Sequence, residues 1–188
     1  MLERPFIVAL VATMSVAGCD QPKSSTESAA QPVPSAGHFT NPPPPSIPGW
    51  PAVKAQPKLK TMKLFVGAEE VTAELAMNQI QIATGMMFRT EMAENEGMLF
   101  VFARPHRPAF YMKNTKVPLN IAYLDEDGTI LELHELQPLN ETPVEAASER
   151  VQYVLEMNKG WFQRHNVAVG SLIRCEYGKL KDTFRFGP

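Results

Sequence analysis

The sequence of 188 residues predicts a mainly β domain of α+β type, either a small barrel or a curled sheet. Three observations support this fold class. Short apolar runs of strand length recur between residues 59 and 176, residues that favour turns separate them, and a helical period appears only briefly. We therefore expect a single compact domain with seven or eight short strands and one or two short helices.

The domain begins with two predicted strands and a helix. Residues 63–66 (KLFV) form a short apolar run, and apolar and polar residues alternate along 71–76 (VTAELA). The period then lengthens, because apolar residues recur three or four positions apart over 78–87, which predicts a short helix. Gly85 weakens this helix, and a second helical turn is predicted over 90–94.

The middle of the domain surrounds a polar stretch with strands. Residues 97–102 (GMLFVF) are continuously apolar and predict a strand buried on both faces. The two prolines of 104–108 (RPHRP) predict a break there, since proline cannot donate to a strand ladder. Two further strand-like runs, 109–113 and 119–125, flank the polar residues 113–116 (KNTK), which we interpret as a turn or strand end.

The last part of the domain begins with a hairpin. Residues 125–128 (DEDG) predict a turn with a glycine suited to positive φ, and 129–136 (TILELHEL) predict the return strand. Alternation over 151–157 predicts another strand, and 160–166 (GWFQRHN) one or two helical turns. Residues 167–177 contain the closing strand segments.

The N-terminus resembles a bacterial lipoprotein signal. Residues 1–18 contain an apolar core that is too short to span a bilayer, and this core ends in SVAGC over 15–19. Small residues directly before a cysteine are typical of a lipobox, so we expect lipid on Cys19. We therefore predict a protein of the cell envelope, anchored in a membrane through Cys19 and facing the periplasm or the exterior.

The segment 19–58 is predicted to be a disordered linker. Ten of the chain's 17 prolines lie in it, and such a composition cannot bury enough apolar surface to fold. The folded domain is then 59–176, and 177–188 form a C-terminal tail. If Cys19 carries lipid, Cys175 is the remaining cysteine, and we expect it to be a buried, unreactive thiol.

The familiar signatures of catalysis and cofactor binding are absent. The sequence contains no nucleophile elbow, zinc-protease motif, Walker loop or dinucleotide fingerprint, and its histidines show no ligand spacing. We therefore predict neither a cofactor nor a metal site. The formal net charge of −2, without a basic stripe, argues against a nucleic-acid partner.

Polar residues inside apolar frames are the candidate site. Charged side chains are rarely buried without a partner, so these residues either hold the fold together or converge on a ligand at the mouth of the barrel. In the structural alternative, Glu156 pairs with Arg89 or Lys113 and Asn114 adopts a left-handed turn. The candidate residues are Arg89, Lys113, Asn114, Asn120 and Glu156.

Several of these segments resemble one protein family. The matching stretches are GMMFR (85–89), NEGMLFVF (95–102), FYMKNTKVPLNIAYLD (110–125) and VLEMNKGW through VAVG (154–170). In this order they resemble the bacterial and archaeal family called domain of unknown function 192, over residues 71–174. The resemblance implies a compact, mainly β domain with a short helix near its start, and members are often exported or lipid-anchored. It carries no established activity.

Three residues depart from the family pattern. Tyr111 stands where the family usually has tryptophan, Asn120 where it usually has aspartate, and Ser171 where aspartate is common. An amide cannot act as a general base, so Asn120 favours binding over catalysis.

Three functions fit the sequence. The first is a membrane-tethered envelope module that binds a small polar, anionic or glycan-like ligand. The second is an envelope hydrolase or transferase that uses Glu156 as its acid or base. The third is a structural or assembly partner without a small ligand. The sequence does not determine the oligomeric state.

Overall fold

The computed structural model of this chain describes residues 52–185. The predicted signal peptide, Cys19 with its predicted lipid and most of the predicted linker lie outside these residues. Within them, no helix has both the length and the apolar character needed to cross a membrane.

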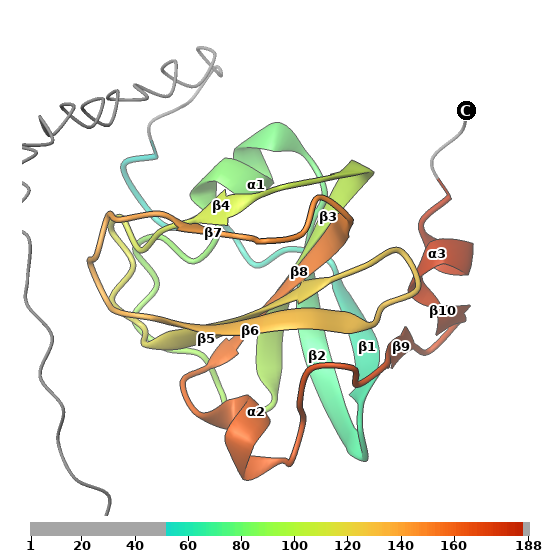
Figure 1. The fold of residues 1–188 in the computed structure, drawn as a ribbon. Helices are drawn as coiled ribbons and strands as arrows, with labels where there is room; N and C mark the ends of the chain where they lie inside the picture. The colour runs from blue at the N-terminus through green and yellow to red at the C-terminus, as the bar shows by residue number, and fades with distance from the viewer. Residues whose placement is uncertain (1–51, 186–188) are drawn as a thin grey trace, which may run out of the picture. The chain divides into compact units, whose positions relative to one another are not determined.

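Most strands belong to one curled sheet, as the sequence predicts (Figure 1). Eight strands follow the order β10–β9–β1–β2–β3–β8–β5–β6, and β4 and β7 pair separately. Neighbouring strands are antiparallel except for β2 and β3, which are parallel. The strands are β1 (Thr61–Val66), β2 (Glu69–Ala76), β3 (Glu96–His106), β4 (Ala109–Phe110), β5 (Leu119–Leu124), β6 (Ile130–Leu136), β7 (Val144–Glu145), β8 (Val151–Asn158), β9 (Ile173–Cys175) and β10 (Gly178–Lys179).

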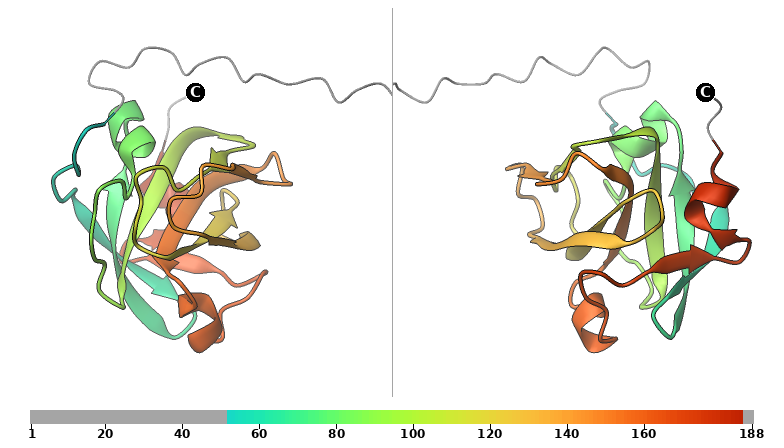
Figure 2. Two further views of the ribbon diagram at one scale, coloured as in Figure 1. Left: turned by 90° about the vertical axis from the view of Figure 1, so that its left-hand side faces the viewer. Right: turned by 45° about the vertical axis from the view of Figure 1, so that its right-hand side comes forward.

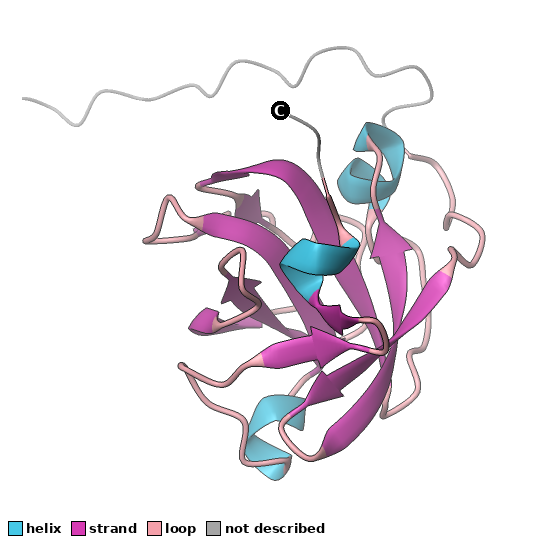
Figure 3. Ribbon diagram, turned by 90° about the vertical axis from the view of Figure 1, so that its right-hand side faces the viewer, coloured by secondary structure: helices cyan, strands magenta, loops and turns pink. Residues whose placement is uncertain are grey.

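Three short helices accompany the sheet: α1 (Gln79–Thr84), α2 (Trp161–Arg164) and α3 (Leu180–Thr183). Helices α1 and α2 lie at opposite ends of the domain, and α3 lies beside β9 and β10 (Figure 3). The folded part therefore continues past residue 176, where the sequence suggested a tail. Leu180 of α3 is fully buried in the core. At the other end, the folded part includes Gln56, whose side chain donates hydrogen bonds to the Gln81 and Gly85 carbonyls.

The sheet curls without closing into a barrel, which decides between the two predicted architectures (Figure 2). The residue before β6 and the residue before β9 form a single bridge, Thr129 to Leu172. Backbone hydrogen bonds support this contact, including Ile130 N–H to the Ser171 carbonyl at 2.9 Å. No ladder between β6 and β10 is present in the described part of the chain.

Each face of the curled sheet buries its own apolar cluster. Alternate residues of a strand point to opposite faces, so Leu99 and Val101 join one cluster while Met98 and Phe100 join the other. The first cluster contains Trp161 of α2, and the second contains Met86, which follows α1. The central strand β8 contributes to both clusters and is buried along almost its whole length.

Several local predictions are confirmed. The turn over 125–128 forms, because the Asp125 carboxylate accepts hydrogen bonds from Asp127 N–H and Thr129 N–H, and Gly128 has a φ of 90°. Cys175 is a buried free thiol.

Other local predictions are wrong in whole or in part. The break predicted over 104–108 is confined to Arg107 and Pro108, because strand β3 continues to His106. The ladder with β8 shifts register between Val101 and His106, and β2 pairs with β3 only as far as Phe100, so Pro105 needs no ladder donor. The second helical turn at 90–94 does not form, and the strand predicted over 109–113 is reduced to the two residues of β4.

Candidate functional site

One row of residues crosses the sheet and contains both of its buried glutamates. Glu74 of β2 lies beside Met98 of β3, which lies beside Glu156 of β8. On the other side of Glu156 lies Ile121 of β5, followed by His134 of β6. Residues paired in this way point to the same face of a sheet. The two glutamates therefore share one face, with the Met98 side chain between them.

Glu156 is buried without a partner. Its residue exposure is 5%, and its Oε2 atom has no hydrogen-bond partner among residues 52–185. Burial raises the pKa of the Glu156 carboxyl to about 8, because the charged form loses its hydration and no nearby cation replaces it. At neutral pH this carboxyl is mostly protonated.

Glu156 lines a pocket of about 280 Å³ on this face of the sheet, which we call the Glu156 pocket. Its walls come from α1 and the turn after it, from β3, from the segment leading into and past β4, and from Thr115. Most lining atoms are apolar. The lining residues are Ile82, Ala83, Thr84, Gly85, Met86, Met87, Phe100, Phe102, His106, Pro108, Ala109, Phe110, Tyr111, Thr115 and Glu156.

Local sequence signals position helix α1, which forms one wall of the Glu156 pocket. Asn78 caps the helix by accepting a hydrogen bond from Gln81 N–H at 2.9 Å, and Gln81 completes a capping box. Gly85 ends the helix at a φ of 47°, and a Cβ there would lie 3.3 Å from the Phe100 ring. The chain can therefore pass directly over Phe100 into Met86 and line the pocket.

The polar stretch 113–116 supports the pocket mainly through its backbone. Asn114 adopts the left-handed conformation with a φ of 54°, and its carbonyl accepts a hydrogen bond from Phe88 N–H at 2.8 Å. Thr115 is buried, lines the pocket and donates its hydroxyl to the Lys113 carbonyl at 3.2 Å. The Lys113 ammonium lies 3.8 Å from the Glu141 carboxylate at the surface and does not line the pocket.

Arg89 is paired with Glu74. Its two terminal nitrogens donate to the two carboxylate oxygens of Glu74 at 2.6 and 2.8 Å, a bidentate arrangement. Glu74 also accepts a hydrogen bond from Leu59 N–H at 2.7 Å. Both side chains are mostly buried, at 13% and 11% exposure. Arg89 is therefore paired with Glu74, and the pairing of Glu156 with Arg89 or Lys113 that the structural alternative predicted does not occur.

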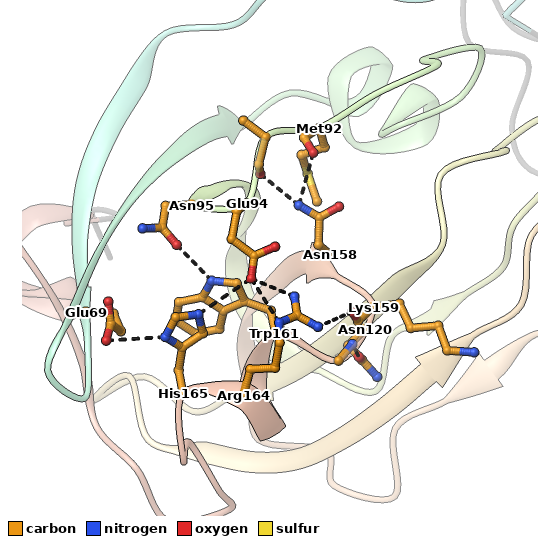
Figure 4. Close-up of polar contacts among 12 residues, drawn as sticks. Glu69, Met92, Glu94, Asn95, Asn120, Asn158, Lys159, Trp161, Arg164 and His165 are labelled. Atoms are coloured by element: carbon orange, nitrogen blue, oxygen red, sulfur yellow. Dashed lines mark hydrogen bonds and ion pairs between the residues drawn. The ribbon is translucent and has the colours of Figure 1, made fainter.

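Asn120 belongs to a polar network around α2, at the other end of the domain (Figure 4). Its side-chain oxygen accepts a hydrogen bond from Gly160 N–H at 2.5 Å, and its amide donates to the His134 carbonyl at 3.1 Å. Nearby, Trp161 donates its indole N–H to Asn95 at 3.0 Å, and its ring stacks on His165 with centroids 4.4 Å apart. This network fixes α2 against neighbouring loops.

The structure thus places the five sequence candidates in different surroundings. Glu156 alone lines the pocket, while Arg89, Lys113 and Asn120 bond to other protein groups and Asn114 shapes a turn. Sequence reasoning missed Thr115 and the aromatic wall of Phe100, Phe102 and Phe110. Apolar residues that line a pocket follow the same spacing as core residues, so no sequence signal separates them. Within 52–185, no group of three or more acidic, histidine or cysteine residues could hold a metal ion.

A protein-family profile matches residues 62–175, which include every strand from β2 to β9. This profile is the domain of unknown function 192, described as an uncharacterised ancient conserved region. The chain belongs to this family. The membership confirms the resemblance that the sequence segments indicated. The matched residues include the lining of the Glu156 pocket and most of the row of residues across the sheet.

Two solved structures resemble this fold. One is a protein from Sinorhizobium meliloti 1021 named as a candidate transcription regulator, 31% identical, with a TM-score of 0.61 over 64% of this chain and 97% of that chain. The other is a protein of unknown function from Novosphingobium aromaticivorans DSM 12444, also 31% identical, with a TM-score of 0.58 over 62% of this chain and 86% of that chain. A comparison with curated proteins finds no match.

Proposed function

We propose that this protein binds a small, largely apolar molecule in the Glu156 pocket, with the Glu156 carboxyl as its polar anchor. One observation carries the proposal: a buried carboxyl oxygen without a partner in residues 52–185 belongs to a residue that lines an apolar pocket. Buried polar atoms in folded proteins are almost always paired. A ligand that supplies the missing partner explains why this atom is left unpaired by the chain itself.

The size and lining of the pocket favour such a ligand over a glycan. At about 280 Å³ the pocket lies near the lower end of the roughly 300–1,000 Å³ typical of small-molecule sites. A glycan presents many hydroxyl groups, each of which needs a polar partner after it leaves water. Most of the wall is instead formed by Met, Phe, Pro and Ala side chains. The lining therefore supports an apolar body with few polar groups.

The test is saturable binding of a neutral fluorescent probe, phenylnaphthylamine, by residues 19–188 carrying Cys19→Ser. Both apolar clusters lie within residues 52–185, so this chain retains the complete folded part. Ala109→Trp fills the pocket from an exposed position on β4, and Ala168→Trp adds the same bulk at an exposed position outside it. We expect one probe per chain, with affinity reduced more than tenfold by Ala109→Trp and unchanged by Ala168→Trp. Equal affinity in all three proteins, or no saturable binding, contradicts the proposal.

The same pocket supports a second candidate, an enzyme with Glu156 as its general acid. A carboxyl that stays protonated at neutral pH inside a pocket is suited to donating a proton to a substrate. The variant Glu156→Gln distinguishes binding from catalysis, because glutamine retains a hydrogen-bonding group but cannot transfer a proton. Turnover of any small ester, amide or glycoside that Glu156→Gln abolishes, while probe binding persists, would favour the enzyme.

We also propose that the protein is tethered to a membrane of the cell envelope through lipid on Cys19. The support is the SVAGC stretch after a short apolar segment, together with a proline-rich linker that precedes the folded part. Fractionation of cells that express the full chain tests this. We expect the protein in the membrane fraction, and Cys19→Ser in the soluble fraction without the mass of the lipid. Membrane association that persists in Cys19→Ser contradicts the anchor.

A further inference from the structure

The Glu156 pocket is lined by one carboxyl group and by no lysine or arginine. Among its lining residues the ionisable side chains are Glu156, His106 and Tyr111. The two cationic residues among the sequence candidates contact other carboxylates: Arg89 forms an ion pair with Glu74, and the Lys113 ammonium lies beside the Glu141 carboxylate. Any permanent positive charge beside the Glu156 carboxyl must therefore come from a ligand.

Part of the pocket wall is aromatic. Phe100 and Phe110 pack edge to face with ring centroids 4.9 Å apart, and Phe102 packs on the His106 ring at 4.5 Å in the same manner. Tyr111 completes the ring-bearing lining. Aromatic faces attract cations through their quadrupole, and this attraction strengthens where water is excluded. A pocket that combines aromatic rings with a single carboxyl is therefore suited to an organic cation.

We infer that the ligand of the Glu156 pocket is a small organic ammonium ion, bound as an ion pair with the Glu156 carboxylate inside the aromatic wall. This inference rests on the proposed function and narrows it to one ligand class. An anionic ligand is disfavoured, because it would face a carboxyl without any lysine or arginine in the lining. A neutral ligand can use the protonated carboxyl as a donor, but it gains neither the ion pair nor the attraction to the rings. An ammonium ion gains both.

Binding of a cation is then linked to the release of a proton. The empty pocket keeps Glu156 protonated below about pH 8, and an ammonium ion binds to the ionised form, so one proton leaves for each ligand bound. Cation affinity should therefore rise roughly tenfold per pH unit below pH 8 and level off above it. Affinity for a neutral ligand that accepts a hydrogen bond from the carboxyl should be constant up to pH 8 and then fall.

The other ionisable groups near Glu156 must be separated from this effect. His106 and Tyr111 line the pocket, and His134 of β6 and Tyr123 of β5 lie on the same face of the sheet. Burial raises the pKa values of Tyr111 and Tyr123, so these hydroxyls stay neutral below pH 8. A His106→Asn variant removes the imidazole and any contribution that it makes to the pH dependence of binding.

The experiment compares three molecules of the same shape: benzylammonium, benzyl alcohol and benzoate. Calorimetric titration of residues 19–188 with Cys19→Ser is performed at pH 6, 7 and 8, and in two buffers with different heats of ionisation. We expect benzylammonium to bind at least tenfold more tightly than benzyl alcohol at pH 8, with no measurable binding of benzoate. At pH 6 and 7, about one proton should be released per benzylammonium bound, in the parent and in His106→Asn. Glu156→Gln should abolish this preference and the proton release.

The outcomes distinguish this inference from the proposed function. If benzyl alcohol binds as tightly as benzylammonium, and Ala109→Trp weakens it, the pocket is a ligand site and the ammonium class is wrong. Tight binding of benzylammonium without proton release, or with the preference intact in Glu156→Gln, also overturns the ion pair. If neither these three molecules nor phenylnaphthylamine binds, the proposed function and the inference both fail.

Discussion

Glu74 and Glu156 lie in one row on the same face of the sheet, with Met98 between them, but their surroundings differ. Glu74 receives a bidentate pair of hydrogen bonds from Arg89 and a third from Leu59 N–H. Glu156 lies on the other side of Met98, is as deeply buried, and has an oxygen without a partner in the described residues. Burial alone therefore does not distinguish them, and the difference lies in what the chain supplies around each carboxylate.

The comparison separates a structural acid from a candidate functional one. A buried charge that is fully paired can be explained by the fold, because each hydrogen bond offsets part of the lost hydration. A buried carboxyl without a partner destabilises the fold, and a glutamine or leucine would be tolerated better at that position. Proteins tend to retain such costly groups at sites of binding or catalysis.

The largest expected effect concerns Glu156 and pH. The pKa of Glu156 is about 8 in the folded protein and near its ordinary value of 4.5 in the unfolded chain. Between these values the unfolded state loses a proton that the folded state keeps, so the Glu156 contribution to stability falls as pH rises through this window and is constant above pH 8. We expect Glu156→Gln to gain up to about 5 kcal/mol of stability relative to the parent from pH 4.5 to 8.

Urea unfolding at several pH values measures this difference. Glu149→Gln is the matched control, because Glu149 is exposed and the same substitution there should give a curve parallel to that of the parent. Parallel curves for the parent and Glu156→Gln would show that the folded chain already stabilises the ionised carboxylate, and the contrast with Glu74 would be lost.

The second effect concerns the paired glutamate. Arg89→Met removes the partner of Glu74 and leaves a buried, unpaired carboxylate, so we expect a loss of about 3–5 kcal/mol at pH 7. The double variant Glu74→Leu/Arg89→Met removes both charges and should lose less than Arg89→Met alone. Urea midpoints of the three proteins provide the measurement. A double variant less stable than the single variant would show that Leu59 and other neighbours need the Glu74 carboxylate itself.

Sequence reasoning recovered the regular part of the fold and one residue of the pocket. Alternation over 71–76 and 151–157 predicted the strands β2 and β8, although β8 is buried on both faces of the sheet. The same stretch identified Glu156 as an ionisable residue within a largely apolar strand. Strands β7 and β10, each of two residues, are too short to show any period.

The partners of the polar residues could not be predicted, because they depend on which strands become neighbours. Glu74 and Glu156 are far apart in the sequence, and only the order β2–β3–β8 places them in one row. Arg89 finds Glu74 through the same non-local arrangement. Strand order in a curled sheet is set by packing of the whole domain, and local spacing carries little of that information.

A smaller effect is expected at Asn120, in the network around α2. Asn120→Ala removes the acceptor of Gly160 N–H and the donor to the His134 carbonyl, both in a buried setting. We expect a loss of about 2–3 kcal/mol, with phenylnaphthylamine affinity of the folded protein unchanged, since Asn120 does not line the pocket. Thermal unfolding and probe titration of the same sample measure both quantities. Weaker probe binding by the fully folded variant would show that the two ends of the domain are coupled.

The smallest effect is expected at Lys113, one of the five residues that the sequence suggested for a ligand contact. Its side chain is 42% exposed, its ammonium lies 3.8 Å from the Glu141 carboxylate, and exposed ion pairs contribute little. Lys113→Ala should therefore change stability by less than about 0.5 kcal/mol and leave the affinities for phenylnaphthylamine and benzylammonium within about twofold of the parent. A titration of the parent and of Lys113→Ala with benzoate decides whether Lys113 contacts the ligand. If the parent binds benzoate and Lys113→Ala does not, Lys113 reaches the ligand after all, and the pocket then accepts an anion at its rim. If benzoate fails to bind both proteins, the charge that selects the ligand is that of Glu156, and the polar stretch 113–116 serves the pocket through the turn at Asn114 and the wall at Thr115.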